Sequence, residues 1–134
     1  MTESSASSPA RLQGWGAAFL ALGAATGAMG AHALEEVLTP ERLESWSTSS
    51  LYLLVMGAGV VGAASARLTP TERKALGAVV VGTAVFSGSI FGLVALATAE
   101  VGAGVRAVLG PLTPVGGVAM IAGWAAFAWS RFRS

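Results

Sequence analysis

Cysteine is missing from this chain of 134 residues, and histidine occurs only once. Without cysteine there is no disulfide bond, no thiolate nucleophile and no sulfur-bound metal site. A single histidine also excludes a haem held by two histidines and a di-iron bundle built on two Glu-x-x-His motifs. These absences remove much of the metal and catalytic chemistry open to a small protein.

Charged residues are also scarce in this chain. Charged residues make up 11% of the chain, against about 25% in a soluble domain. The formal net charge is +1, and the basic residues form no patch of the kind that binds a phosphate backbone. The composition therefore excludes a soluble globular domain and argues against nucleic acid as a partner.

Long apolar runs are what the chain has instead. Four runs carry no Asp, Glu, Lys or Arg: Leu12–Leu34, Ser45–Ala66, Ala75–Ala99 and Ala107–Ser130. Each is longer than the roughly 20 residues that cross a hydrocarbon core about 30 Å thick. We therefore predict an all-α fold, a bundle of four transmembrane helices whose spans cover residues 13–33, 48–66, 75–99 and 114–130. These lie in one membrane domain, residues 11–134, behind a polar N-terminal tail, residues 1–10.

The positive charges in the short loops predict the orientation. Six lysines and arginines lie on the side of the two termini and the second loop, at Arg11, Arg67, Arg73, Lys74, Arg131 and Arg133. Only Arg42 and Arg106 lie on the other side. Because cytoplasmic loops carry the excess of basic residues, we expect a multi-pass protein of the inner (plasma) membrane with both termini in the cytoplasm.

Three Thr-Pro pairs mark expected helix starts, at Thr39-Pro40, Thr69-Pro70 and Thr113-Pro114. Threonine caps the first free amides, and proline is tolerated at the first helical position. After Pro40 the chain stays charged for several residues, which predicts a short interfacial helix in the first outer loop. The segment 110–117 holds two prolines and three glycines, so we expect a turn there, just before the fourth span.

Glycine pairs predict close helix contacts. Gly23 with Gly27 and Gly88 with Gly92 have the GxxxG spacing that lets backbones approach each other in lipid. Contacts within one four-helix bundle account for these pairs. Association with a second copy or with another membrane protein through the glycine-rich faces is the alternative, and the two are compatible.

His32 is the one candidate for acid–base chemistry. Glu35 and Glu36 follow it by three and four residues, which places all three on one face of a continuous helix. Such a pair could move protons or orient a base. A histidine near a helix C-terminus is more often structural, so we predict no catalytic residue, no cofactor and no metal site.

Inside the expected spans the polar groups are hydroxyls, among them Tyr52, Ser87 and Ser89, with no clearly intramembrane charge. Pumps and coupled transporters usually place a charged residue there. We expect the two serines to hydrogen-bond to a neighbouring helix or to their own backbone.

Several short motifs together resemble one family. Residues 27–34 read GAMGAHAL, 39–41 read TPE, 86–89 read FSGS, 113–117 read TPVGG and 122–124 read AGW. In this order they resemble the small membrane proteins related to bacterial YgdD, whose eukaryotic relatives are called transmembrane protein 256. The resemblance implies a four-span protein of the bacterial inner membrane, or of its mitochondrial counterpart, with no defined biochemical activity.

One position departs from that pattern. Family members follow the loop helix with an aromatic residue, a threonine, a tyrosine and then a histidine four residues after the tyrosine. Trp46, Thr48 and Tyr52 fit, but Met56 stands at the histidine position. If two histidines form a site in the family, half of it is absent from this chain.

The sequence therefore favours a non-enzymatic accessory or packing subunit of a membrane assembly, in contact with the bilayer and with another membrane protein or itself. A small oligomeric transporter or channel is the alternative, and an enzyme built on His32 is a third. The positions that we single out as candidates for function or packing are His32, Glu35, Glu36, Tyr52, Ser87, Gly88, Ser89, Gly92, Thr113 and Pro114.

Overall fold

The computed structural model describes residues 7–100 and 102–133, which form four α-helices. They are α1 (Pro9–His32), α2 (Pro40–Ala64), α3 (Pro70–Thr98) and α4 (Ala103–Phe132), and the described residues contain no strand. The predicted all-α fold with four long helices is confirmed. The N-terminal tail that we predicted falls mostly on residues 1–6, outside the described residues.

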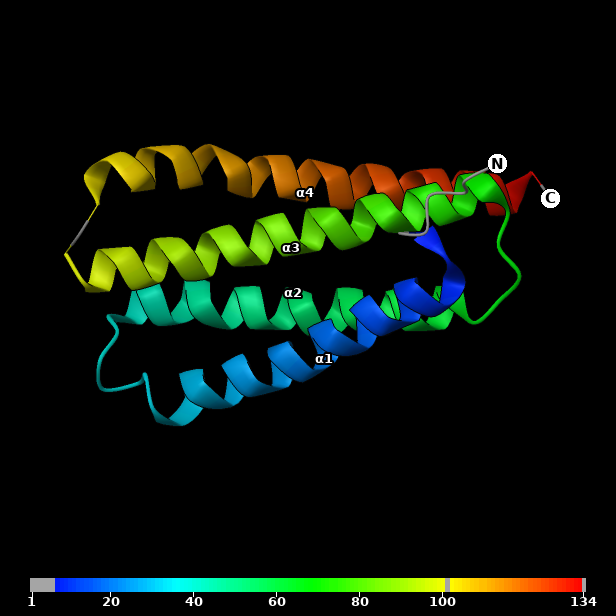
Figure 1. The fold of residues 1–134 in the computed structure, drawn as a ribbon. Coiled ribbons are helices and arrows are strands. Elements are labelled where there is room, and N and C mark those ends of the chain that lie inside the picture. Colours follow the sequence, from blue (N-terminus) through cyan, green and yellow to red (C-terminus); the bar gives the residue numbers. More distant parts are fainter. Residues whose placement is uncertain (1–6, 101, 134) are drawn as a thin grey trace.

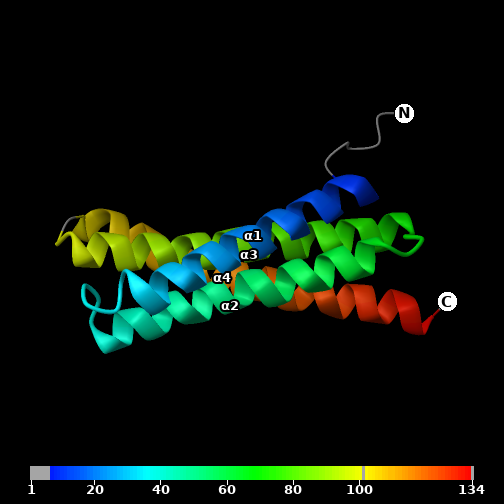
Figure 2. The same ribbon diagram turned by 90° about the horizontal axis from the view of Figure 1, so that it is seen from below.

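The helices run antiparallel to their chain neighbours (Figure 1). The most extensive contacts pair α1 with α2 and α3 with α4, and α2 packs against α3 between these two pairs. Figure 2 shows α1 crossing the bundle at an angle, and α1 also contacts α3. We call the end with the start of α1 and the end of α4 the terminal end, and the opposite end, with the end of α1 and the start of α4, the distal end (Figure 1).

Three of the helices, α2, α3 and α4, are long and apolar enough to cross a membrane. The first helix, α1, has 24 residues, about 36 Å of helix, which is enough length. Its most apolar stretch falls short of the hydropathy that the other three helices reach. Length and composition therefore support three spans, α2, α3 and α4.

The Thr-Pro pairs at positions 39 and 69 start helices as predicted. The Thr39 hydroxyl accepts a hydrogen bond from the Arg42 amide at 3.4 Å. Thr69 and Glu72 form a complete capping box at the start of α3, each side chain accepting from the backbone amide of the other. These caps satisfy amides that have no partner within the helix.

The expected short interfacial helix is not present as a separate element. In the described first connection, residues 33–39, the chain forms turns. The charged residues after Pro40 are instead the first turns of α2, which continues without interruption to Ala64. A cap at Thr39, proline at the first helical position and then residues 41–56 without glycine or proline give the helix no reason to stop near its start.

The predicted turn at residues 110–117 is wrong. The last helix, α4, begins at Ala103 and continues through Pro111 and Pro114. Thr113 caps no helix, and its hydroxyl instead lies 2.7 Å from that of Ser89 on α3. Prolines are tolerated within membrane helices because neighbouring helices and hydroxyl side chains stabilise the interrupted segment, and here α3 packs along it.

Apolar side chains from α1, α2 and α3 form the centre of the bundle. The most buried include Leu12, Val60, Leu76 and Val79, all at most 1% exposed. Glycine lets the paired helices approach more closely than side chains would allow. Gly16 of α1 faces Gly57 of α2, and Gly82 of α3 faces Gly116 of α4.

Candidate functional site

His32 and the two glutamates that follow it lie at the distal end. His32 is the last residue of α1, and Glu35 and Glu36 lie in the turns beyond it. The three therefore do not share one helix face. All three are exposed, and their side chains make no hydrogen bond or ion pair with the described residues. Within this part of the chain, no group of three His, Cys, Asp or Glu could hold a metal ion.

Ser87 lies in the contact between α2 and α3. Its hydroxyl donates to the Ser49 carbonyl at 3.2 Å, and the Ser49 hydroxyl donates to the Ser87 carbonyl at 3.0 Å. Both residues are at most 1% exposed. This reciprocal pair joins the two helix pairs at the centre of the bundle and confirms the predicted hydrogen bond to a neighbouring helix.

Ser89 lies in the contact between α3 and α4. Its hydroxyl donates to the Phe86 carbonyl at 2.9 Å and lies 2.7 Å from the Thr113 hydroxyl. A similar pair joins α1 to α2, where the Ser50 hydroxyl donates to that of Thr26 at 2.9 Å. These hydroxyls therefore connect helices, whereas the buried Thr83 hydroxyl donates to the Val79 carbonyl of its own helix at 2.7 Å.

Two more of the predicted positions pack against aromatic or aliphatic side chains. Tyr52 on α2 stacks at an angle on Phe86 of α3, with ring centroids 4.7 Å apart. A Cβ placed on Gly92 would lie 3.1 Å from Leu109 of α4. Gly88, by contrast, is exposed and has nothing within 4 Å of such a Cβ.

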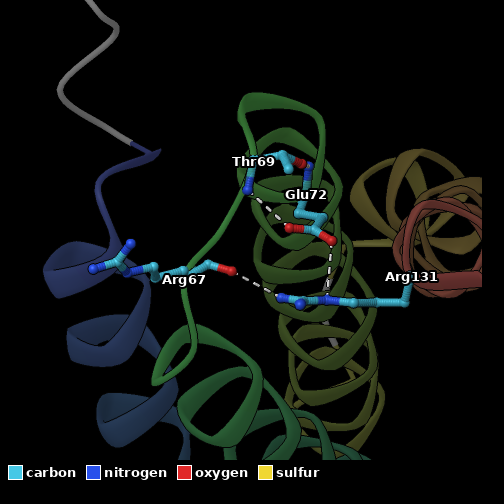
Figure 3. A network of polar contacts seen from close by, with 4 residues as sticks. All are labelled: Arg67, Thr69, Glu72 and Arg131. Carbon is cyan, nitrogen blue, oxygen red and sulfur yellow. Dashed lines mark hydrogen bonds and ion pairs between the residues drawn. The ribbon is translucent and has the colours of Figure 1, made fainter. Parts of the chain in front are cut away.

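Sequence reasoning missed an ion pair at the terminal end (Figure 3). The Glu72 side chain, 2% exposed, lies 2.9 Å from Nε of Arg131, and Arg131 also donates to the Arg67 carbonyl at 3.0 Å. The second Glu72 oxygen accepts from the Thr69 amide at 2.8 Å. One carboxylate thus joins α3, α4 and the α2–α3 connection. The capping-box spacing identified Glu72, but nothing in the sequence pairs it with a residue 59 positions later.

Grooves open on the surface of the bundle, and two of them differ in their lining. One, about 560 Å³, lies at the distal end between α2, α3 and α4 and carries hydroxyls and one carboxylate. The other, about 470 Å³, lies toward the terminal end between α1 and α3 and is mainly apolar, with Lys74 at its edge. Both volumes fall within the range of about 300–1,000 Å³ that is usual for ligand pockets.

Comparison with known proteins identifies the family. A family model described as a protein of unknown function (DUF423) matches residues 26–117. A UPF0382 membrane protein of Schizosaccharomyces pombe is 37% identical over 100 residues, covering 74% of this chain and 82% of the relative. The chain belongs to the DUF423 family. A UPF0382 membrane protein of Staphylococcus epidermidis is 35% identical over 109 residues, covering 80% of this chain and 81% of the relative.

Membership in DUF423 confirms the resemblance to a family of small membrane proteins whose function is unknown. No solved structure matches the chain. The matched region, residues 26–117, includes the serine contacts and the distal groove. Arg131, which pairs with Glu72, lies beyond it.

The structure also separates the two positions at which the family resemblance implies histidines. In this DUF423 protein the Met56 sulfur accepts a hydrogen bond from Nε1 of Trp124 on α4 at 3.1 Å. The next residue, Gly57, contacts Gly16 on α1. His32 lies 16 residues further along α1 than Gly16, about 24 Å away. Position 56 and His32 therefore cannot form one site within a single chain.

Proposed function

We propose that this DUF423 protein crosses the membrane four times, has no enzymatic activity and serves as an accessory or packing subunit of a membrane assembly. One observation carries the proposal. Among the described residues, no buried side-chain nitrogen or oxygen lacks a hydrogen-bond partner. The polar groups of the interior are thus already engaged in hydrogen bonds, several of them between helices, which leaves few of them for catalysis or for lining a pore.

The packing of α1 supports a fourth span. Gly16 and Gly23 both contact α2, and Gly30 near the other end of α1 lies against Trp46. A helix held along its length by a membrane-crossing neighbour shares that neighbour's depth in the bilayer. The small residues along α1 let it pack closely on α2, and close packing is what makes membrane helices associate. This packing favours a place for α1 in the membrane although its hydropathy is lower than that of the other helices.

The positions of the helix ends support termini on the same side. The start of α1 and the end of α4 lie at the terminal end (Figure 1). Arg67 and Lys74, in and just beyond the α2–α3 connection, lie at that end as well. The excess of basic residues there favours the cytoplasmic side of the inner (plasma) membrane.

The outward face of α1 is the surface that we assign to a partner. Its alanines are exposed, at positions Ala17, Ala21, Ala24, Ala25 and Ala28. Small residues let another membrane helix approach closely. A second copy of the chain or a different membrane protein would fit this face.

The test is purification of the tagged protein in a mild detergent, followed by mass spectrometry of what remains bound. We expect a stoichiometric membrane partner with the native chain and its loss with Ala21→Leu. Ala125→Leu, an equally exposed alanine on α4, is the matched control and should keep the partner. A lone chain, or equal loss with both variants, contradicts the proposal.

The same preparation distinguishes the transporter alternative. Reconstituted into proteoliposomes, an accessory subunit without its partner should leave solute flux at the level of empty vesicles. A flux that depends on the protein would favour an oligomeric transporter or channel instead.

A further inference from the structure

The distal groove is polar on its walls and apolar on its floor. Glu44 and Thr48 of α2 line one wall, and Gly110 and Thr113 of α4 line the other. Ile90 and Leu93 of α3 belong to the floor. A groove that combines an anionic side chain, hydroxyls and an apolar strip suits a ligand with a polar head and an apolar tail.

The walls offer several hydrogen-bond acceptors, and hydroxyls are their only side-chain donors. Pro114 has no N–H, so the Gly110 carbonyl loses the donor that a regular helix supplies four residues later. Gly110 lines the groove, and without a side chain it contributes backbone atoms. The Glu44 carboxylate and the Thr48 hydroxyl make no hydrogen bond or ion pair with the described residues. Next to lipid, such acceptors need a donor from outside the chain.

The depth of these residues corresponds to the headgroup region. Glu44 and Thr48 lie four and eight residues after the start of α2, and Gly110 lies seven residues after the start of α4. These positions are about 6–12 Å from the helix ends. Helices of 25 and 30 residues, about 38 and 45 Å long, extend beyond a hydrocarbon core of about 30 Å. The groove therefore spans the boundary between headgroups and acyl chains.

A positive charge lies one helical turn from the acceptors. Arg106 precedes Gly110 by four residues on α4, so the two lie on the same side of the helix. Arg106 is exposed, and its side chain makes no ion pair with the described residues. Glu44 of α2 lines the groove, and Arg106 lies one turn nearer the distal end of α4 than Gly110, so the two opposite charges lie at the same end of the bundle.

We propose that the distal groove binds a zwitterionic aminophospholipid with a primary ammonium group. The ammonium donates to Glu44, Thr48 and the Gly110 carbonyl, the phosphate interacts with Arg106, and an acyl chain lies against Ile90 and Leu93. An ammonium supplies a positively charged donor, and no residue that lines the groove carries a positive charge. This binding goes beyond the proposed accessory role and requires no partner protein.

The test compares three lipids with identical acyl chains by native mass spectrometry of the purified protein. Phosphatidylethanolamine has three N–H donors, phosphatidylcholine has the same charge without a donor, and phosphatidylglycerol has neither the cation nor an N–H. We expect phosphatidylethanolamine to bind about tenfold more tightly than phosphatidylcholine, because hydrogen bonds from a charged donor are the strong ones. Phosphatidylglycerol should bind most weakly.

Two variants connect the preference to the groove. Glu44→Gln removes the negative charge at nearly constant size, and Pro114→Ala returns an N–H donor to the Gly110 carbonyl. Each should reduce the preference for phosphatidylethanolamine over phosphatidylcholine to less than threefold. Glu36→Gln, an exposed glutamate at the same end outside the groove, is the control and should keep the preference.

Equal binding of phosphatidylethanolamine and phosphatidylcholine would overturn the proposal, since charge alone would then account for binding. An unchanged preference in Glu44→Gln, or no retained lipid at all, would also overturn it and leave water in the groove. Circular dichroism of each variant establishes that the helices are intact, so loss of binding is not mistaken for unfolding.

Discussion

The two helix pairs, α1 with α2 and α3 with α4, are held together by the same kind of contact. A Cβ on Gly57 would lie 2.7 Å from the carbonyl oxygen of Gly16, and a Cβ on Gly116 would lie 2.7 Å from that of Gly82. Each pair also has one hydroxyl–hydroxyl contact. The sequence around these residues differs between the pairs, so the shared feature is physical: close backbones and one polar contact replace the missing hydrophobic drive in lipid.

The pairs differ at the terminal end. Glu72 and Arg131 join α3 to α4 through a buried carboxylate. At the same end, α1 and α2 are joined by a neutral hydrogen bond from Gln13 to Ser65, 3.2 Å long and exposed. The comparison teaches that the α3–α4 pair is the more tightly constrained of the two, and substitutions there should cost more stability.

The largest effect is expected from Gly116→Ala. The added Cβ would lie 2.5 Å from the Phe86 amide nitrogen and 2.7 Å from the Gly82 carbonyl oxygen. Both are backbone atoms, so α3 and α4 must separate, at a cost of about 3 kcal/mol, the upper part of the overpacking range. Reversible unfolding in mixed detergent micelles, followed by circular dichroism, measures the free energy of unfolding.

Two matched variants sharpen that result. Gly57→Ala should be less harmful, because after the Gly16 oxygen its next contact lies at 3.1 Å. Gly88→Ala has open space and should be neutral or stabilising by up to about 1 kcal/mol, since alanine favours the helix. Equal losses at Gly116 and Gly88 would show that close approach is not what holds the pair.

Arg131→Met should have the next largest effect. It leaves the Glu72 carboxylate, 2% exposed, with the Thr69 amide and the Ser130 side chain as partners but without its cation. Since Arg131 is 40% exposed, we expect a loss of about 2 kcal/mol rather than the larger cost of a fully buried pair. The same unfolding assay applies, with Arg133→Met two residues away as control. A loss below that of the control contradicts the role of the ion pair.

Removal of the hydroxyl contacts should lower the free energy of unfolding by less than Arg131→Met does. The loss should be the same in the two helix pairs. Ser89→Ala in the second pair and Ser50→Ala in the first should each lose about 0.6 kcal/mol, the average for such contacts in membrane helices. A double-mutant cycle of Ser89→Ala with Thr113→Val isolates the contact itself. A coupling near zero would assign the stability to packing alone.

His32→Ala should have the smallest effect. Its side chain is exposed and makes no hydrogen bond or ion pair with the described residues, so we expect a change in unfolding free energy within about 0.5 kcal/mol. The lipid preference of the distal groove should also stay unchanged. Loss of a measurable activity with the helices intact would instead revive the enzyme hypothesis.

The helices could be predicted from the sequence because their signals are local. The uncharged runs identified all four, and Thr39 and Thr69 marked two starts by the chemistry of capping. The error at Pro111 and Pro114 has a tertiary cause. A helix through two prolines is stable only with a neighbour such as α3 in place. Helix propensities describe single residues, so they do not take a neighbouring helix into account.

The candidate positions divide in the same way. A hydrogen bond from Ser87 or Ser89 to a neighbouring helix follows from the cost of an unpaired hydroxyl in lipid, without knowing which helix is adjacent. The pairing of Glu72 with Arg131 and the opening of the distal groove depend on which helices meet and at what level. A single sequence does not show which helices are neighbours or which of their residues lie at the same level.

The two serines of α3 also limit how the protein can move. Ser87 contacts α2 and Ser89 contacts α4, and two residues correspond to about 200° around a helix. A rotation or a one-turn slide of α3 would therefore break its polar contacts on both sides at once. A conformational change that keeps both contacts has to move α2, α3 and α4 together as one unit, which leaves α1 as the helix that can change its position.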